Sequence, residues 1–169
     1  MKIEAGNYYH VYNRGNNRGM IFFHEKDYAH FLNQFSKYLK SSIEIYAHCL
    51  MPNHFHFFVK IKNKVEFEKG IKNFFISYVK HINLKYKRVG SLFQGRYRVR
   101  EVNSDSYFTK IITYIHQNPL VLPAVDRLED YKYSSYREYL GDVPSRLNKD
   151  EVINWFGNLT QFIIAHKTL

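Results

Sequence analysis

Two histidines, His54 and His56, stand one residue apart in an apolar segment of the chain. Alternate residues of a strand point to the same face, so a strand here would project both imidazoles from one side and Phe55 and Phe57 from the other. Two neutral imidazoles that converge on one point make half of a metal site. The chain has 9 histidines, and two incidental strand histidines are an equally good interpretation of the pair alone.

A tyrosine and an asparagine, Tyr114 and Asn118, could complete such a site. Apolar residues at helical spacing predict a helix from Ser104 or Asp105 to about Asn118, because Pro119 stops it there. Side chains four residues apart on a helix lie one turn apart, so both could reach one point. An amide oxygen suits Mg²⁺ or Mn²⁺, and three protein ligands would leave coordination positions open for substrate oxygens.

A metal ion at this point would act as a Lewis acid on a phosphate, and the neighbouring tyrosine could attack the phosphorus. Each residue also has a structural interpretation. Asn118 could cap its own helix before the proline, and Tyr114 is one of 15 tyrosines, whose ordinary role is packing. Tyr107, two turns earlier on the same flank, is a spare nucleophile for which packing is the better interpretation. His116 and Gln117 point elsewhere on the helix and receive no catalytic role.

The elements that must position these residues follow in the order strand, helix, strand, strand, helix, strand. We expect them at about 8–13, 28–39, 43–50, 54–61, 66–85 and 92–102. This order is typical of an α+β fold with a ferredoxin-like split βαβ unit, an antiparallel sheet with two helices on one face. The tyrosine-bearing helix would then lie near the histidine face, and residues 131–169 would add two or three short helices, with a turn at 141–144.

The chain has 169 residues, enough for one domain with a substantial core. We divide it into a catalytic domain at 1–141 and a C-terminal helical extension of the same domain at 142–169. The net charge of +10 favours a polyanionic partner, either nucleic acid or an anionic membrane. No apolar stretch approaches the ~20 residues of a membrane span. The single cysteine, Cys49, suits a small core residue in a reducing cytoplasm, so we expect a cytoplasmic protein without a membrane partner.

Several segments together resemble one family. His54-Phe55-His56 is similar to the histidine-hydrophobic-histidine motif of the single-tyrosine HUH transposases, and the run Tyr-Ile-His-Gln-Asn-Pro at 114–119 is similar to their tyrosine helix. The branch that includes the REP-associated tyrosine transposases is the more specific resemblance. It rests on the segments at 9–15, 51–56, 92–97, 133–136 and 139–141. The resemblance runs in the right order over about residues 7–141.

This resemblance implies a metal-dependent transposase and single-strand endonuclease. His54, His56 and Asn118 would hold Mg²⁺ or Mn²⁺, and Tyr114 would attack a phosphate of single-stranded, hairpin-flanked DNA. A 5′-phosphotyrosine link and a free 3′-hydroxyl would result, and a 3′-hydroxyl could later reseal the DNA without an external energy source. Binding to DNA would bring the protein to the nucleoid. Mobile members of the family often assemble the site from two chains, whereas REP-associated relatives can act as monomers, so a homodimer is a possible state.

A DNA surface is expected around residues 85–100, which contain six basic residues and no acidic one. Aromatic residues are interleaved, which gives phosphate contacts beside stacking platforms for unpaired bases. A solvated basic hairpin is the alternative interpretation. Two lysines that continue the histidine strand and two arginines of the first turn add to this surface. The full expected set is Arg14, Arg18, Lys60, Lys62, Lys85, Lys87, Arg88, Phe93, Gln94, Arg96, Tyr97, Arg98 and Arg100.

Two other functions stay open on the sequence. One is a nucleic-acid-binding module on the same scaffold whose catalysis has lapsed, although the complete set of histidines, tyrosine and asparagine argues against it. The other is a hydrolase of small phosphoesters in which the tyrosine is incidental. The basic, aromatic-rich surface and the lack of a carboxylate base near the histidines disfavour this hydrolase. The apolar residues between Val152 and Ile163 indicate a helical cap that packs on the core rather than a hairpin or dimer contact.

Overall fold

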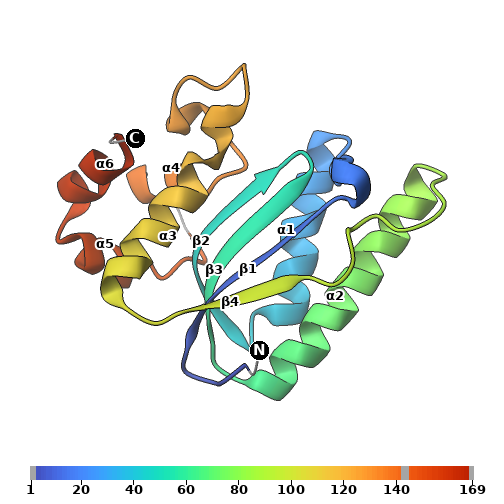
Figure 1. Cartoon of the computed structure of the whole chain (residues 1–169), viewed down its shortest axis with the longest axis horizontal. Helices are drawn as coiled ribbons and strands as arrows, with labels where there is room; N and C mark the ends of the chain where they lie inside the picture. Colours follow the sequence, from blue (N-terminus) through green and yellow to red (C-terminus); the bar gives the residue numbers. More distant parts are fainter. Residues whose placement is uncertain (1–2, 142–144, 168–169) are drawn as a thin grey trace.

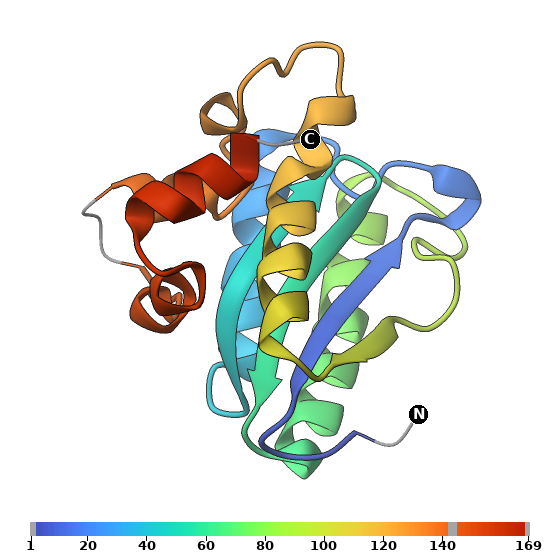
Figure 2. The ribbon, with the colours of Figure 1, turned by 60° about the vertical axis from the view of Figure 1, so that its left-hand side comes forward.

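The computed structural model describes residues 3–141 and 145–167. Its centre is an antiparallel sheet of four strands in the order β2-β3-β1-β4. The strands are β1 (Tyr8–Arg14), β2 (Ile43–Met51), β3 (His54–Ile61) and β4 (Arg98–Val102). Helices α1 (Glu25–Leu39) and α2 (Lys64–Lys85) cover one face, and α3 (Asp105–Gln117) crosses the other (Figures 1 and 2). The predicted α+β class and its four-stranded antiparallel sheet are confirmed.

The remaining elements are short. Three 3₁₀ turns lie at η1 (Asn16–Arg18), η2 (Asn118–Val121) and η3 (Leu128–Asp130). Three helices follow at α4 (Tyr136–Leu140), α5 (Lys149–Phe156) and α6 (Leu159–Lys167), on the α3 side of the sheet (Figure 2). Most of the turn expected at 141–144 lies outside the described residues. No helix in the described part of the chain is long and apolar enough to cross a membrane.

The face of β3 opposite the histidines is the floor of the main core. Phe55 and Phe57 are fully buried there under α1 and α2, and the Phe35 ring stacks on that of Phe57 with centroids 4.0 Å apart. The two helices approach closely at Gly70, where an added Cβ would lie 2.4 Å from the carbonyl oxygen of Tyr38. The alternation predicted for this strand therefore separates an aromatic core from the histidine side.

Two element boundaries differ from the expectation. Helix α2 begins at 64 rather than 66, because the Asn63 side chain accepts a hydrogen bond from the Glu66 amide and caps the first turn. The stretch at 92–102 is a strand only from Arg98 onward. Gly95 has a φ of +70°, which breaks the extended conformation, so 92–97 is an irregular segment.

The C-terminal helices belong to a second core on the α3 side. The side chains of Val152 and Phe162 are fully buried in it together with Phe108 of α3, and the Trp155 ring lies 4.8 Å from the Phe108 ring. These contacts agree with the predicted packing of the C-terminal residues on the core. The division at 141/142 itself stays a prediction.

A chain of buried histidines ties α3 to α6. Nδ1 of His116 lies 2.8 Å from Nε2 of His166, and Nε2 of His116 lies 2.8 Å from the Ser135 hydroxyl. Nδ1 of His166 donates to the carbonyl of Phe162 at 2.7 Å. His116 is therefore a structural residue, in agreement with the absence of a catalytic assignment. If both imidazoles were protonated, two N–H groups would face each other between His116 and His166.

We predict that these histidines make the protein acid-sensitive. Burial lowers the pKa of His166 to about 4 and, together with the neighbouring imidazoles, holds the pKa of His116 well below its ordinary value. In the unfolded chain both titrate near 6.5, so below that pH the unfolded state binds more protons and the free energy of unfolding falls as pH decreases. Between pH 6.5 and 5 each histidine contributes at most about 2 kcal/mol to this loss. Urea denaturation from pH 7 to 5 should give a shallower dependence for His116→Gln, and parallel slopes would contradict the prediction.

Candidate active site

The two histidines lie at the beginning of β3, directly after the turn at 51–53. His56 is buried and opposes Tyr12 of β1, whereas His54 is half-buried at the first position of the strand. Their ring centroids are 5.1 Å apart. Both lie on the α3 side of the sheet, because Phe55 between them points into the main core. The expectation that α3 lies against the histidine face is confirmed, since Tyr114 of α3 contacts the His56 ring.

Hydrogen bonds fix which nitrogen of His54 is free. Its Nδ1 lies 2.6 Å from Oδ1 of Asn53, and the amide of Asn53 is oriented because its Nδ2 donates to the carbonyl of Arg18 at 3.1 Å. A carbonyl-type oxygen can only accept, so Nδ1 of His54 carries the proton and donates. The lone pair of neutral His54 is therefore on Nε2.

Asn118 presents its amide oxygen to this lone pair. Nδ2 of Asn118 donates to the carbonyl of Tyr114 at 2.8 Å, so Oδ1 is the atom that lies 3.3 Å from Nε2 of His54. With the His54 proton on Nδ1, two acceptors face each other with no proton between them. One end of the Asn118 amide therefore closes α3, and the other end faces the histidine.

His56 supplies a third acceptor in the tautomer that carries its proton on Nδ1. Its Nδ1 lies 2.8 Å from Nε2 of His10, and its own Nε2 is a buried nitrogen without a hydrogen-bond partner among the described residues. A proton on Nδ1 of His56, donated to His10, leaves the lone pair on the orphaned Nε2. An unpartnered buried nitrogen costs roughly 1–3 kcal/mol, and this cost is removed when the lone pair binds a cation.

These three atoms fit a divalent metal ion. Two imidazole nitrogens and one amide oxygen are a ligand set suited to ions such as Mn²⁺. In the described parts of the chain, no group of three His, Cys, Asp or Glu side chains could hold a metal ion. The protein group that lies beside the two histidines is the amide of Asn118. The outward Nε2 atoms of His54 and His56 would be the nitrogen ligands.

The histidines are held neutral, as metal ligands must be. Burial, reinforced by the nearby Arg100, lowers the pKa of His10 to about 4. Burial, with the neighbouring imidazoles of His10 and His54, lowers the pKa of His56 to about 2. The pKa of His54 is also lowered, mainly by burial. All three imidazoles therefore offer lone pairs at neutral pH.

Tyr114 reaches the same point from α3. Its side chain is 51% exposed, and its ring lies edge-on to the His56 ring at 5.5 Å and to the His10 ring at 6.2 Å. A cavity of about 400 Å³ opens in front of it, lined also by His54 and His56. The phenol is thus accessible to a substrate in this cavity. Tyr114, His54 and His56 therefore line one cavity, and Asn118 contacts His54 beside it.

Comparison with known proteins agrees with this geometry. The family model described as "Transposase IS200 like" matches residues 5–118, a range that contains every residue of the cluster. The chain belongs to the IS200-like transposase family. No curated protein matches the sequence.

Among solved structures, this IS200-like transposase is similar to a REP-associated tyrosine transposase bound to a REP hairpin. The TM-score is 0.68 at 16% sequence identity, over 86% of this chain and 91% of the other, so the two share a fold. A second solved structure, of a candidate transposase from Deinococcus radiodurans R1, has a TM-score of 0.46 at 17% identity over 69% of this chain and 97% of the other.

Part of the expected DNA surface lies at the cavity of this transposase. Arg14, Arg18, Gln94 and Arg98 line it together with the histidines and Tyr114. Arg100 is exposed on β4 and opposes His10 in the register. Several cationic side chains therefore surround the point where a phosphate would meet the tyrosine.

The irregular segment at 92–97 is docked so that Gln94 reaches this cavity. The backbone N–H of Gln94 donates to the carbonyl of Arg14 at 2.9 Å, and the backbone N–H of Asn16 donates to the carbonyl of Leu92 at 3.0 Å. Nδ2 of Asn13 donates to the carbonyl of Gly95 at 3.3 Å, and Nε of Arg14 donates to the Gln94 side chain. The end of β1 thus fixes both the arginine and the glutamine.

The other expected DNA residues are placed elsewhere. Lys60 lies at the far end of β3, with its ammonium over the Tyr8 ring, and Lys62 is exposed just beyond that strand. Lys87 is exposed after α2, and the Arg88 guanidinium lies over the Phe23 ring. Arg96 and Tyr97 line a different cavity, next to α2.

Two members of the set have structural roles that differ from the expectation. Phe93 is only 5% exposed and packs in the main core against Phe75, so it cannot stack on a base in this conformation. The Lys85 ammonium lies 2.6 Å from the buried carboxylate of Asp27. Burial alone would raise the pKa of Asp27, but hydrogen bonds from Lys85 and Tyr86 and from two backbone amides lower it to about 2. Lys85 therefore stabilises the fold.

The sequence interpretation assigned no role to His10 or Asn53. His10 touches His56, and Asn53 sets the tautomer of His54, so both position the candidate ligands. The sequence did hold a signal for His10. Tyr8, His10 and Tyr12 are alternate residues of one strand and therefore share a face, and β1 pairs with the histidine strand β3. Strand pairing across β1 and β3 was needed to see the contact.

Proposed function

We propose that this transposase cleaves and rejoins single-stranded, hairpin-flanked DNA through a 5′-phosphotyrosine intermediate. The observation that carries the proposal is that the exposed phenol of Tyr114 lines one cationic cavity together with His54 and His56, while the amide oxygen of Asn118 lies 3.3 Å from Nε2 of His54. A DNA partner is supported by the net charge of +10 and by the hairpin bound to the relative of similar fold.

Transesterification at Tyr114 follows from this arrangement. The phenol oxygen attacks the phosphorus, the bond from phosphorus to the 3′ oxygen breaks, and the phenol proton is balanced by the proton that the released 3′-hydroxyl acquires. Arg14, Arg18 and Arg98 hold the phosphates by charge-assisted hydrogen bonds. Reversal by a 3′-hydroxyl of the same or another strand restores the phenol, so one phosphodiester is exchanged for another and no external energy is required.

The proposed cofactor is Mg²⁺ or Mn²⁺ on His54, His56 and Asn118. Such an ion would supply Lewis-acid stabilisation of the negative charge that builds on the phosphate oxygens. The protein's contribution is to keep both imidazoles neutral and correctly oriented. Through Asn53 and His10 the ligand nitrogens are oriented before any ion arrives, which lowers the entropy cost of binding it.

The test is incubation with labelled hairpin oligonucleotides and Mn²⁺, followed by a denaturing gel. A protein–DNA adduct that is absent with EDTA is the expected result. A catalytically lapsed binding module would bind the hairpins without an adduct. A hydrolase of small phosphoesters would release phosphate from a model diester without any covalent product.

His10 is predicted to act as a positioning residue for the metal. In the proposed metal-binding tautomer, Nδ1 of His56 donates to Nε2 of His10, so His10→Phe should leave the His56 tautomer unfixed and raise the dissociation constant for Mn²⁺ by about 10–100-fold. Electron paramagnetic resonance of Mn²⁺ measures this directly. His10→Gln should lose less Mn²⁺ affinity than His10→Phe, because the glutamine amide oxygen can still accept a hydrogen bond. Unchanged affinity in His10→Phe would show that the contact is only packing.

All four site residues come from one chain, so we propose that a monomer can carry the chemistry. The homodimer stays a prediction, which light scattering of the protein with and without a hairpin would test. With DNA as its partner, the protein is proposed to lie in the cytoplasm, and at the nucleoid when it is bound to DNA.

A further inference from the structure

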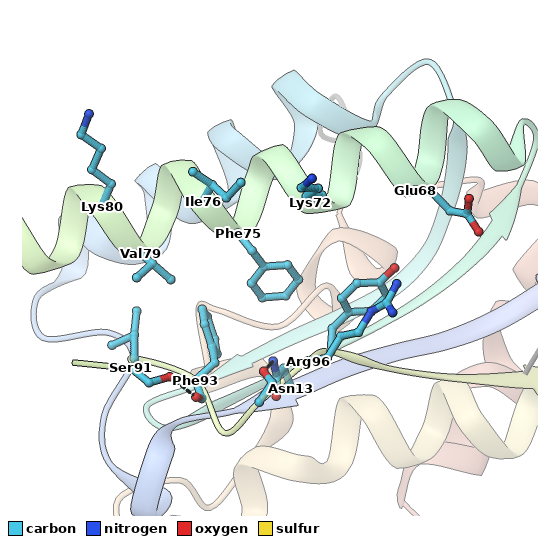
Figure 3. A pocket seen from close by; sticks show the side chains of 13 residues that line it. Asn13, Glu68, Lys72, Phe75, Ile76, Val79, Lys80, Ser91, Phe93 and Arg96 are labelled. Atoms are coloured by element: carbon cyan, nitrogen blue, oxygen red, sulfur yellow. Dashed lines mark hydrogen bonds between the residues drawn. The ribbon is translucent and has the colours of Figure 1, made fainter.

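A second and larger cavity lies between α2 and the 91–97 segment, and we call it the α2 groove. Its volume is about 880 Å³, within the range of ~300–1,000 Å³ typical of ligand pockets. Figure 3 shows Phe75 and Val79 directed from α2 toward the segment, with Phe93 opposite them. Tyr97 completes the wall, its ring nearly parallel to that of Phe75 at 8° and 5.6 Å. The groove therefore has an aromatic interior.

The rim of the α2 groove is cationic. Lys72, Lys80 and Arg96 line it, against one carboxylate, Glu68. Neither lysine has an ion-pair partner within the described ranges, and the Arg96 guanidinium lies 5.6 Å from the centre of the Tyr97 ring. Cations around an aromatic interior complement a ligand that is flat and apolar in one part and anionic in another.

The α2 groove and the active-site cavity adjoin. Asn13 lines both of them, and the segment between them contributes Gln94 to the active-site cavity and Gly95 to the groove. Gly95 has no side chain, and a Cβ built on it would meet nothing within 4 Å. The space outside Gly95 is therefore open, and a chain that runs from the active-site cavity to the groove would pass over this residue.

We propose that the α2 groove binds an unpaired nucleotide of the same DNA strand whose phosphate lies at Tyr114. Its base packs on Phe75 and Tyr97, and its phosphates meet Lys72 and Arg96. This inference rests on the proposed function, and it adds a specificity site for single-stranded DNA beside the chemistry. A paired base could not enter the groove. In a duplex the faces of each base are stacked on the neighbouring base pairs, so they cannot pack on Phe75 and Tyr97.

The test uses Ile76, a groove residue whose side chain is 58% exposed on α2. Ile76→Glu places a carboxylate in the groove without removing a core contact. Val65→Glu is the matched control, because Val65 is 74% exposed on the same helix and does not line the groove. Both variants carry Tyr114→Phe so that only binding is measured, and both change the net charge equally. Thermal melting checks that each is folded.

The probe is a fluorescent oligothymidine longer than ~16 nucleotides, since stacking on aromatic side chains tolerates any base. Ile76→Glu should bind it about tenfold more weakly than the control, the usual effect of losing one stacked base. Lys72→Gln should weaken binding relative to Lys69→Gln, an exposed lysine of α2 outside the groove. Equal affinity of each variant and its control, or no binding at all, overturns the proposal.

The two proposals can fail separately. An adduct on Tyr114 in the otherwise wild-type protein, together with equal binding by Ile76→Glu and Val65→Glu, would reject the groove and keep the chemistry. Weaker binding by Ile76→Glu without any adduct in the wild type would keep the groove as a single-strand site and reject the chemistry.

Discussion

Tyr114→Phe is expected to abolish the covalent protein–DNA adduct, with a loss of strand cleavage on the order of 10³-fold or more. The substitution removes one oxygen atom and leaves the ring against the His56 ring, at a side chain that is half exposed. Folding and hairpin binding should therefore be unchanged. Cleavage of a labelled hairpin on a denaturing gel, beside a binding titration of the same variant, gives both quantities.

Tyr107→Phe is the matched control for this prediction. Tyr107 lies two turns earlier on α3, is 58% exposed, and contacts the Lys110 ammonium rather than the histidines. Loss of the Tyr107 hydroxyl should leave the protein–DNA adduct unchanged. Cleavage that survives Tyr114→Phe would point instead to water as the nucleophile and to a hydrolase.

The second large effect is expected at Asn118. Asn118→Ala removes the only oxygen ligand of the proposed metal site and should raise the dissociation constant for Mn²⁺ by more than the roughly 10–100-fold typical of outer-shell partners. Cleavage should fall in parallel, because the phosphate charge is no longer stabilised. Mn²⁺ binding by paramagnetic resonance and cleavage over a range of Mn²⁺ concentrations test both.

Asn118→Asp distinguishes between the role of Asn118 as a metal ligand and its role as a helix cap. Neither alanine nor aspartate can donate to the carbonyl of Tyr114 as Nδ2 of Asn118 does, so both variants lose this hydrogen bond, and aspartate also adds an unfavourable negative charge at the helix C-terminus. Only aspartate keeps an oxygen opposite Nε2 of His54. Retained Mn²⁺ binding in Asn118→Asp and loss in Asn118→Ala is the predicted pattern, and equal behaviour of the two would argue that Asn118 only closes its helix.

The convergence of the site could be predicted because it depends on local periodicity. The period of two along β3 puts His54 and His56 on one face, and the helical period puts Tyr114 one turn from Asn118. That the helix packs on the histidine face followed from the other two helices covering the phenylalanine face. These placements needed no knowledge of which strands pair.

Features that depend on pairing or on tertiary contacts could not be predicted. His10 reaches His56 only because β1 and β3 pair in one particular register. Phe93 lies in a basic, exposed-looking run, yet Gly95 turns the chain and α2 covers the ring. Lys85 belongs to the same run, but a buried carboxylate 58 residues earlier binds its ammonium. Composition describes such a run as a surface, while the fold assigns its members to a core, an ion pair and two separate cavities.

The most direct measurement is to identify the amino acid that carries the DNA. The protein would be incubated with Mn²⁺ and the hairpin that gives an adduct, digested with nuclease and protease, and sequenced by tandem mass spectrometry. We predict a nucleotide joined through its 5′-phosphate to Tyr114, in the peptide that contains Asn118. A nucleotide on any other residue, Tyr107 included, or cleaved DNA with no modified peptide, would contradict the account.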